Sequence, residues 1–199
     1  MKHHILALLL VLFISDYLIA QTNKRHVPIS IGIYAPYGTQ PGGNIGTHID
    51  LKEWETEKIS KEKTYINSKK LFFSPQLGIF VRPKNHTSYI LNVDIGYRMK
   101  RSNRRIYIAP SLGLGYILEN RILGKTIDLS NGNNIDKDKE LRHLLLPTLN
   151  FEISKEPKKQ VGWFLKLSYG RKISSQIEDS AFTSLELGIK FNLQLGSEK

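Results

Sequence analysis

Along most of this chain, bulky apolar side chains alternate with small or polar ones. In the clearest run, residues 105–118, one parity holds Ile106, Ile108, Pro110, Leu112, Leu114, Tyr116 and Leu118, and the other holds Tyr107, Ala109, Ser111, Gly113, Gly115 and Ile117. Because successive side chains of a β-strand point to opposite faces, a period of two predicts a strand whose faces meet different surroundings. The same alternation recurs at residues 27–37, 71–82, 88–100, 141–153, 161–172 and 183–195. A weaker eighth candidate, residues 45–54, has only Ile45, Ile49 and Leu51 on its apolar face.

The first twenty residues have the order of a secretory signal. Lys2 precedes an apolar run at residues 5–14, and Ala20 stands before the expected cut at Gln21. A charged start, a short apolar middle and a small residue at the cut are typical of exported proteins. The run is too short to cross a bilayer as a helix, which needs roughly 20 residues. We therefore expect a signal peptide at residues 1–20 and one exported domain at residues 21–199.

Composition excludes several classes of protein. The chain has no Cys, so it has no disulfide framework, thiolate metal site or lipid-modified cysteine. Its net charge of +11 would suit nucleic acid, but export and the lack of a basic helix argue against that partner. The acidic residues Asp136, Asp138 and Glu140 alternate with lysines and lack the glycine of a calcium loop, so we expect a solvated loop. No metal or other cofactor is expected.

The glycines separate three all-β architectures. Each strong segment carries five to seven bulky apolar side chains on one face, too many for the narrow interior of a soluble eight-stranded barrel. A β-sandwich would accommodate them but would leave the other face in water, where glycine only weakens a strand. That polar face holds Gly32, Gly78, Gly96, Gly113, Gly115, Gly162, Gly170 and Gly188. In a membrane barrel the bulky face meets lipid, and the glycines make room inside a narrow lumen.

The connections between segments also alternate in length. Residues 100–104 and 154–160 are short, whereas residues 119–140 form a long polar stretch. Short turns on one side and longer loops on the other are typical of outer-membrane barrels. Residues 55–70 break this rule, so either the second strand is longer than its apolar pattern or that turn is extended.

Aromatic residues on the bulky face gather near the expected strand ends. Tyr89 and Tyr97 are eight residues apart, which spans roughly 21 Å along the membrane normal at about 40° of tilt. The apolar band of such barrels is about 25 Å tall and has an aromatic girdle at each edge. Alternatively, aromatics simply favour strands. The predicted girdle consists of Tyr37, Tyr89, Tyr97, Tyr116, Trp163, Tyr169 and Phe191.

Taken together, the signal, the eight alternating segments and the closing run at residues 185–193, Leu-Glu-Leu-Gly-Ile-Lys-Phe-Asn-Leu, resemble the small outer-membrane β-barrel proteins of Gram-negative bacteria. The resemblance is to the eight-stranded OmpA/OmpX-like architecture, and the closing run is similar to the aromatic-bearing last strand of that family. It implies an eight-stranded antiparallel up-and-down transmembrane β-barrel in the outer membrane. The implied partners are the barrel-assembly machinery during biogenesis and outer-membrane lipid, including lipopolysaccharide.

Charged residues of both signs fall on the predicted lumen face. Lys166 and Glu186 come almost opposite each other if residues 172–181 close a hairpin, and opposite charges placed that way stabilise a strand pair. The predicted lumen network consists of Arg82, Asp94, Arg98, Arg142, Glu152, Lys166, Glu186 and Lys190. Such a network would plug the barrel. The alternative is a set of unpaired, solvated rim charges.

Some small outer-membrane barrels are lipid A deacylases or acyltransferases, so catalysis is also considered. His86 and Ser88 have the His-x-Ser spacing of the deacylase type, and a hydroxyl beside an imidazole can be an activated nucleophile. Their parity points them toward the lumen, whereas that substrate lies in lipid. We therefore predict a non-enzymatic barrel with a plugged lumen and a structural or interaction role. The alternatives are a lipid-modifying barrel enzyme, a narrow pore and a soluble exported β-sandwich.

Overall fold

The computed structural model describes residues 26–60, 63–82, 86–101, 105–122, 139–155, 161–174 and 180–194. Within these ranges it contains the strands β1 (His26–Pro36), β2 (Gly42–Thr47), β3 (Ile49–Ser60), β4 (Lys63–Arg82), β5 (His86–Arg101), β6 (Ile106–Ile122), β7 (Lys139–Lys155), β8 (Val161–Lys172) and β9 (Ser180–Gln194). No helix of this part of the chain is long and apolar enough to cross a membrane. The expected signal at residues 1–20 lies outside the described residues.

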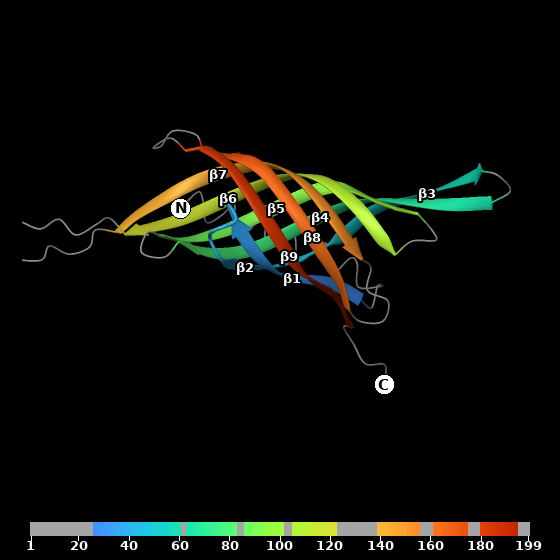
Figure 1. Ribbon diagram of the computed structural model, residues 1–199, viewed down its shortest axis with the longest axis horizontal. Helices are drawn as coiled ribbons and strands as arrows, with labels where there is room; N and C mark the ends of the chain where they lie inside the picture. The colour runs from blue at the N-terminus through green and yellow to red at the C-terminus, as the bar shows by residue number, and fades with distance from the viewer. Residues whose placement is uncertain are drawn as a thin grey trace, which may run out of the picture.

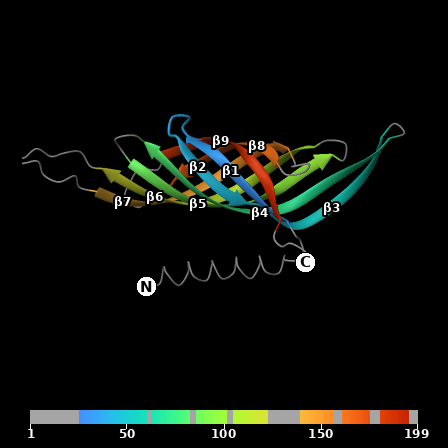
Figure 2. The same ribbon diagram turned by 90° about the horizontal axis from the view of Figure 1, so that it is seen from below.

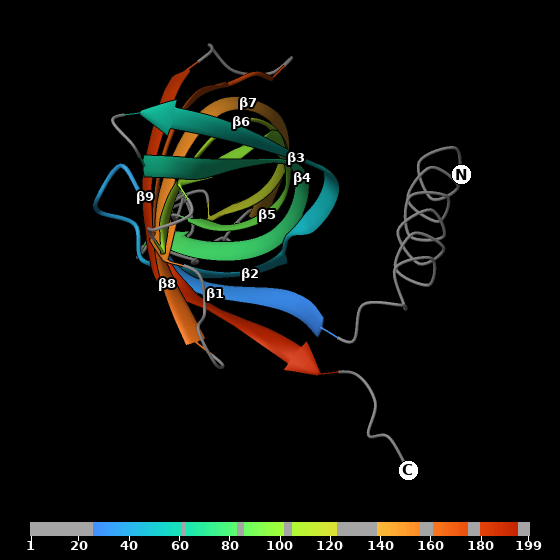
Figure 3. The ribbon, with the colours of Figure 1, turned by 90° about the vertical axis from the view of Figure 1, so that its right-hand side faces the viewer.

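The strands form one closed antiparallel sheet. Its order is β2-β1-β9-β8-β7-β6-β5-β4-β3, and the further pairing of β2 with β4 closes the ring. In Figures 1 and 3 the inclined strands curve around a common interior. Strand β1 begins and β9 ends at one end of the barrel, which we call the terminal end, with His26 opposite Gln194. The other end, which we call the loop end, carries the connections β1–β2, β4–β5, β6–β7 and β8–β9.

Strands β2 and β3 together make one barrel strand, so the barrel has eight. β2 pairs with both β1 and β4, whereas β3 pairs with β4 alone. His48 is unpaired, but the register with β4 is the same on both sides of it, and the ladder shifts register only between Asp50 and Lys52. Ile45 and Ile49 therefore share one face, opposite Leu77 and Phe73, as expected, although Ile49 is buried and Ile45 is exposed. Leu51 falls within the register shift, and such a shift turns the side chains that follow it to the other face.

The long second connection is an extension of the strands. β3 and β4 stay paired from Ile49↔Phe73 to Ser60↔Lys63, past the last pair between β4 and β5 at Asn67↔Arg101. Figure 2 shows this ribbon projecting at one end of the barrel, opposite the end reached by β6 and β7. Of the two alternatives left open by residues 55–70, the longer strand is correct.

The apolar face of each barrel strand points outward. Large side chains such as Ile33, Leu112 and Leu187 are more than half exposed. The bulky wall and the polar lining of the closed ring identify a transmembrane barrel, and the predicted fold class is confirmed. A soluble protein of this size would not expose such a band of apolar side chains to water.

The predicted girdle residues lie on this outer wall in two groups. Tyr37, Tyr89, Tyr116 and Tyr169 stand toward the loop end, and Tyr97, Trp163 and Phe191 stand toward the terminal end. All are exposed except Phe191, which is half-buried. Two interfacial girdles would require such a grouping, and their contact with the membrane interfaces stays a prediction.

Candidate functional site in the barrel interior

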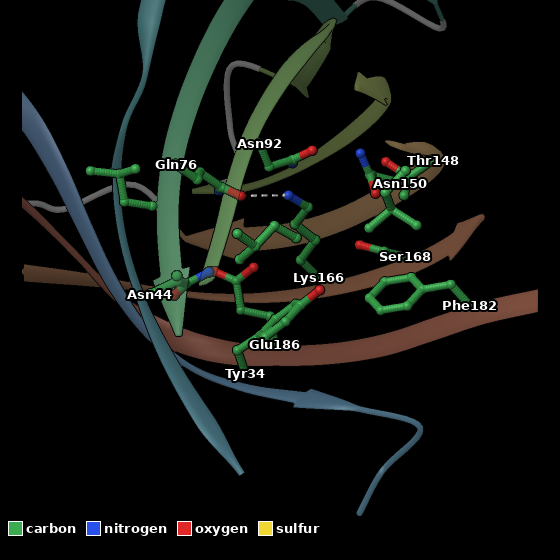
Figure 4. A pocket seen from close by; sticks show the side chains of 14 residues that line it. Tyr34, Asn44, Gln76, Asn92, Thr148, Asn150, Lys166, Ser168, Phe182 and Glu186 are labelled. Carbon is green, nitrogen blue, oxygen red and sulfur yellow. Dashed lines mark hydrogen bonds between the residues drawn. The ribbon is translucent and has the colours of Figure 1, made fainter. Parts of the chain in front are cut away.

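A layer of polar side chains crosses the middle of the barrel. The Lys166 ammonium on β8 lies 2.5 Å from Asp94 Oδ2 on β5 and donates a hydrogen bond of 3.0 Å to Gln76 Oε1 on β4. The amides of Asn92 and Asn150 donate to the other Asp94 oxygen at 2.8 and 2.9 Å. Figure 4 shows Lys166 reaching toward Gln76 from the opposite wall. All five side chains are buried, so the ion pair and its hydrogen bonds replace the water that these groups lose.

A second ion pair lies closer to the terminal end. Lys190 on β9 pairs with Glu152 on β7 and donates a hydrogen bond of 3.0 Å to the Tyr107 hydroxyl. Ser154 donates to the same Glu152 carboxylate at 2.6 Å. Both charged residues are buried, so this pair also bridges strands inside the barrel.

The expected partnership of Lys166 with Glu186 takes a different form. The two residues are directly opposite each other in the β8–β9 ladder, and both are buried. The Lys166 ammonium nevertheless lies on Asp94, three strands away around the barrel. Because the wall is curved, inward side chains point toward the opposite strands. A residue across the lumen can therefore be as close to Lys166 as its direct neighbour in the ladder.

Two apolar clusters flank the charged layers, one toward each end of the barrel. Toward the loop end, the first cluster consists of Tyr34, Phe80, Ile90, Ile117, Leu144, Leu146 and Phe182. Toward the terminal end, Phe72, Tyr107 and Ala109 form the second. Members of both clusters are at most 8% exposed. The charged layers therefore lie between two apolar ones.

The remaining predicted lumen residues lie near the rims. Arg98 pairs with Asp50 at 3.3 Å at the terminal end, and Arg142 pairs with Glu140 at 2.6 Å at the loop end. Arg82, the last residue of β4, has the inward parity and stands opposite the buried His86, but it is exposed, so it lies at the loop-end rim and not inside the lumen as predicted. Asp50 was missed although the period of two already gives it the inward parity, opposite to that of Ile45 and Ile49 and level with the buried Phe72.

A further cluster of charged side chains lies at the loop end, beyond the first apolar cluster. Glu119 accepts from Arg121 at 2.7 Å, and the Lys172 ammonium lies 3.9 Å away. His86 Nδ1 is 3.8 Å from the same carboxylate. Glu119 and Lys172 share the inward parity of their strands, so the period of two already contained this signal.

The His86 and Ser88 pair points inward. Ser88 is fully buried, and Glu119 stands directly opposite it in the β5–β6 ladder. A hydroxyl, an imidazole and a carboxylate thus share one region, but on the lumen side of the wall, away from the lipid-facing surface. Ser88 therefore faces the lumen and not the lipid-facing surface.

A small cavity lies beside the Lys166 layer. It has a volume of about 20 Å³ and is lined by Asn92, Asn150, Lys166 and Glu186 among others (Figure 4). That size and polar lining suit about one water molecule. Among the described residues no group of three or more His, Asp or Glu could hold a metal ion. Asp136 and Asp138 lie outside the described residues.

No protein-family model matches the chain, and no curated protein sequence is significantly similar to it. Several solved structures are similar. The N-terminal β-barrel domain of Pseudomonas aeruginosa OprF is 14% identical, with a TM-score of 0.49 over 85% of this chain and 98% of that one. Neisserial surface protein A is 10% identical, with a TM-score of 0.47 over 85% and 96% of the two chains. The outer-membrane enzyme PagL is 9% identical, with a TM-score of 0.45 over 82% and 97%.

Proposed function

We propose that this chain, a small eight-stranded barrel of the outer-membrane type, is a non-enzymatic outer-membrane protein with a plugged lumen and a structural or interaction role. The observation that carries the proposal is the stack of buried layers inside the barrel. Two ion-paired layers, around Lys166–Asp94 and Lys190–Glu152, lie between two apolar clusters.

The stack opposes conduction for a physical reason. An eight-stranded barrel has an interior only just wide enough for its own side chains. A hydrated ion would have to separate a buried ion pair and also cross the apolar cluster that contains Phe80 and Phe182. Neither step returns the hydration energy that the ion gives up.

The orientation of the barrel follows from its connections. The strand ends that short connections join, from β5 to β6 and from β7 to β8, lie at the terminal end, as do the start of β1 and the end of β9. The strand ends of β6 and β7, which a long connection joins, lie at the loop end. By the usual asymmetry of such barrels, the terminal end faces the periplasm and the loop end faces outward. Export by the signal at residues 1–20 belongs to the same proposal.

Electrical recording in planar bilayers tests the plug. Purified protein is incorporated into a bilayer in molar potassium chloride, with a known porin as a positive control. We expect no stepwise conductance from the wild-type barrel. A variant with Phe80→Ala and Phe182→Ala thins the loop-side cluster and supports the reasoning if it alone gives openings. Steady conductance by the wild type would overturn the plug and favour a narrow pore.

The second candidate function, a lipid-modifying enzyme, rests on the proximity of His86, Ser88 and Glu119. Its prediction is opposite to ours: loss of Ser88 would alter the acyl chains of lipid A. Mass spectrometry of lipid A from wild-type, deletion and Ser88→Ala strains separates the two functions.

A further inference from the structure

The ribbon of β3 and β4 has one strand edge without a neighbour. Among the described residues β3 pairs with β4 alone and ends the sheet order, whereas every other strand has neighbours on both sides. About every second residue of such a strand directs its backbone N–H and C=O to the open side, where no strand pairs with them. An unpaired edge of this kind can receive an extended peptide as an additional strand.

The second half of β3 extends beyond the barrel wall. Trp54 is half-buried, and its ring centroid lies 6.1 Å from that of the girdle residue Tyr97, so Trp54 stands at the level of the terminal-end girdle. Residues 55–60 continue past it, stay paired with β4 as far as Ser60↔Lys63 and project from the end of the barrel (Figure 2). They span about 20 Å at about 3.4 Å per residue, which is the length of an ordinary strand. One added strand therefore fits outside the membrane.

The charges beside this edge determine which segment fits. One face of β3 has an acidic residue at every second position, Glu53, Glu55 and Glu57, which we call the acidic row. Opposite these positions in the ladder, β4 places Lys70, Ser68 and Ile66, so one cation stands opposite three acids. Lys70 Nζ lies 3.1 Å from the Glu53 carboxylate, whereas Glu55 is exposed opposite an uncharged serine. This face of the ribbon is therefore acidic, although the whole chain has a net charge of +11.

A second copy of the chain is a poor occupant of the edge. When two β3 strands pair antiparallel about a twofold axis, opposite residues lie on the same face, so the acidic row of one copy meets that of the other. Like charges directly opposite each other destabilise a strand pair, whereas opposite charges stabilise it. The acidic row thus disfavours self-pairing and favours a segment that has cations at the same spacing. The other face, which carries Trp54 and Thr56, suits β-branched or aromatic side chains at the alternate positions.

We propose that the free edge of β3 binds an extended polypeptide segment that has Lys or Arg at every second position, by addition of a strand to the ribbon. The backbone of the segment pairs with β3, and its cations lie beside the acidic row. Strand pairing supplies affinity, and the charges select the partner. Under the proposed orientation the ribbon lies in the periplasm, so the partner is a protein with a periplasmic segment. That location rests on the proposed function, whereas the free edge and its charges do not.

Fluorescence anisotropy of a labelled peptide tests this strand addition. The probe is an eight-residue peptide of alternating Lys and Thr, added to the full barrel in zwitterionic detergent. We expect saturable binding to the wild type and about tenfold weaker binding to Glu55→Lys, because a favourable cross-strand charge pair becomes unfavourable. Glu140→Lys makes the same change of net charge at the loop end and should bind as the wild type does. Replacing residues 57–66 with a two-residue turn removes most of the projecting edge and should abolish binding while the heat-dependent gel shift remains.

Two N-methylated peptides distinguish strand pairing from charge attraction. One is methylated on the backbone nitrogen of every Lys and the other on that of every Thr, so their charges are equal. In an added strand only one of these two sets of N–H groups faces β3. We therefore expect one peptide to lose binding and the other to retain it.

Several results would overturn the proposal. Equal affinity of the two methylated peptides, whether retained or lost, would exclude strand addition. Equally tight binding of a peptide of alternating Glu and Thr would exclude selection by charge, and a wild type that binds no peptide would exclude the site. Wild-type dimers that disappear when residues 57–66 are replaced would assign the edge to a second copy. A non-conducting wild type that binds no peptide removes this inference but leaves the proposed function intact.

Discussion

Replacing Lys166 with Met isolates the contribution of the central ion pair. The change keeps the length of the side chain and removes its charge, so Asp94 is left buried without its cation. Breaking one side of a buried pair costs about 3–5 kcal/mol. Asn92 and Asn150 still donate to Asp94 at 2.8 and 2.9 Å, which limits the loss. We therefore expect the free energy of unfolding to fall by about 3 kcal/mol, at the lower end of that range.

A double variant also removes the Asp94 charge that Lys166→Met leaves without its cation. Asp94→Asn keeps an oxygen for the two asparagine amides, so Lys166→Met with Asp94→Asn should lie within about 1–2 kcal/mol of the wild type. Lys69 is exposed on β4, and Lys69→Met serves as a control with an expected change below about 0.5 kcal/mol.

Urea unfolding in lipid vesicles measures these differences. The fluorescence of Trp54 and Trp163 reports the transition, and gel mobility provides a second probe. If Lys166→Met unfolds at the same urea concentration as Lys69→Met, the buried pair contributes nothing to stability. A double variant less stable than Lys166→Met alone would equally refute the reasoning.

Three further predictions follow from the wall and the lumen. A methyl group on Gly113 would meet Thr148, Asp94 and Asn150, so Gly113→Ala should lower the free energy of unfolding by about 1–3 kcal/mol in the same assay. Gly43→Ala is the control and should change it little, because the nearest atom to the added methyl group is 3.7 Å away. Ser88→Ala should leave the lipid A acyl pattern unchanged by mass spectrometry, because this serine is fully buried in the lumen. Replacing residues 57–66 with a two-residue turn should leave the heat-dependent gel shift intact, since the described residues of this range, 57–60 and 63–66, pair only with each other and with no other barrel strand.

The wall of the barrel was predictable because its physics is local. Alternation along residues 88–100 and 183–195 places Asp94 and Glu186 inward and Tyr89 and Leu187 outward, as the structure has them. Each strand has one face toward lipid and one toward the lumen. The alternation of residue types within a single strand therefore shows which face is which. Glycines such as Gly113 lie where long side chains from neighbouring strands need the space.

Contacts across the lumen could not be predicted from the sequence, because they depend on the register of all the strands around the ring. Lys166 reaches Asp94 across the lumen because the stagger of the strands brings β5 and β8 to the same level, and no pattern within β8 contains that information. The register shift between Asp50 and Lys52 changes the inward parity of β3, and no proline or glycine in residues 49–53 indicates it. Arg82 has the right parity for the lumen, but its strand ends before that direction places it inside.

Heat-modifiability on a gel after outer-membrane fractionation tests whether this chain is a closed membrane barrel. A closed membrane barrel is expected to remain folded in unheated detergent sample and to change mobility on boiling. We expect this shift, and we expect it in the outer-membrane fraction. A protein found in the soluble periplasmic fraction with the same mobility before and after boiling would contradict it, because the bulky outer wall could not then face lipid.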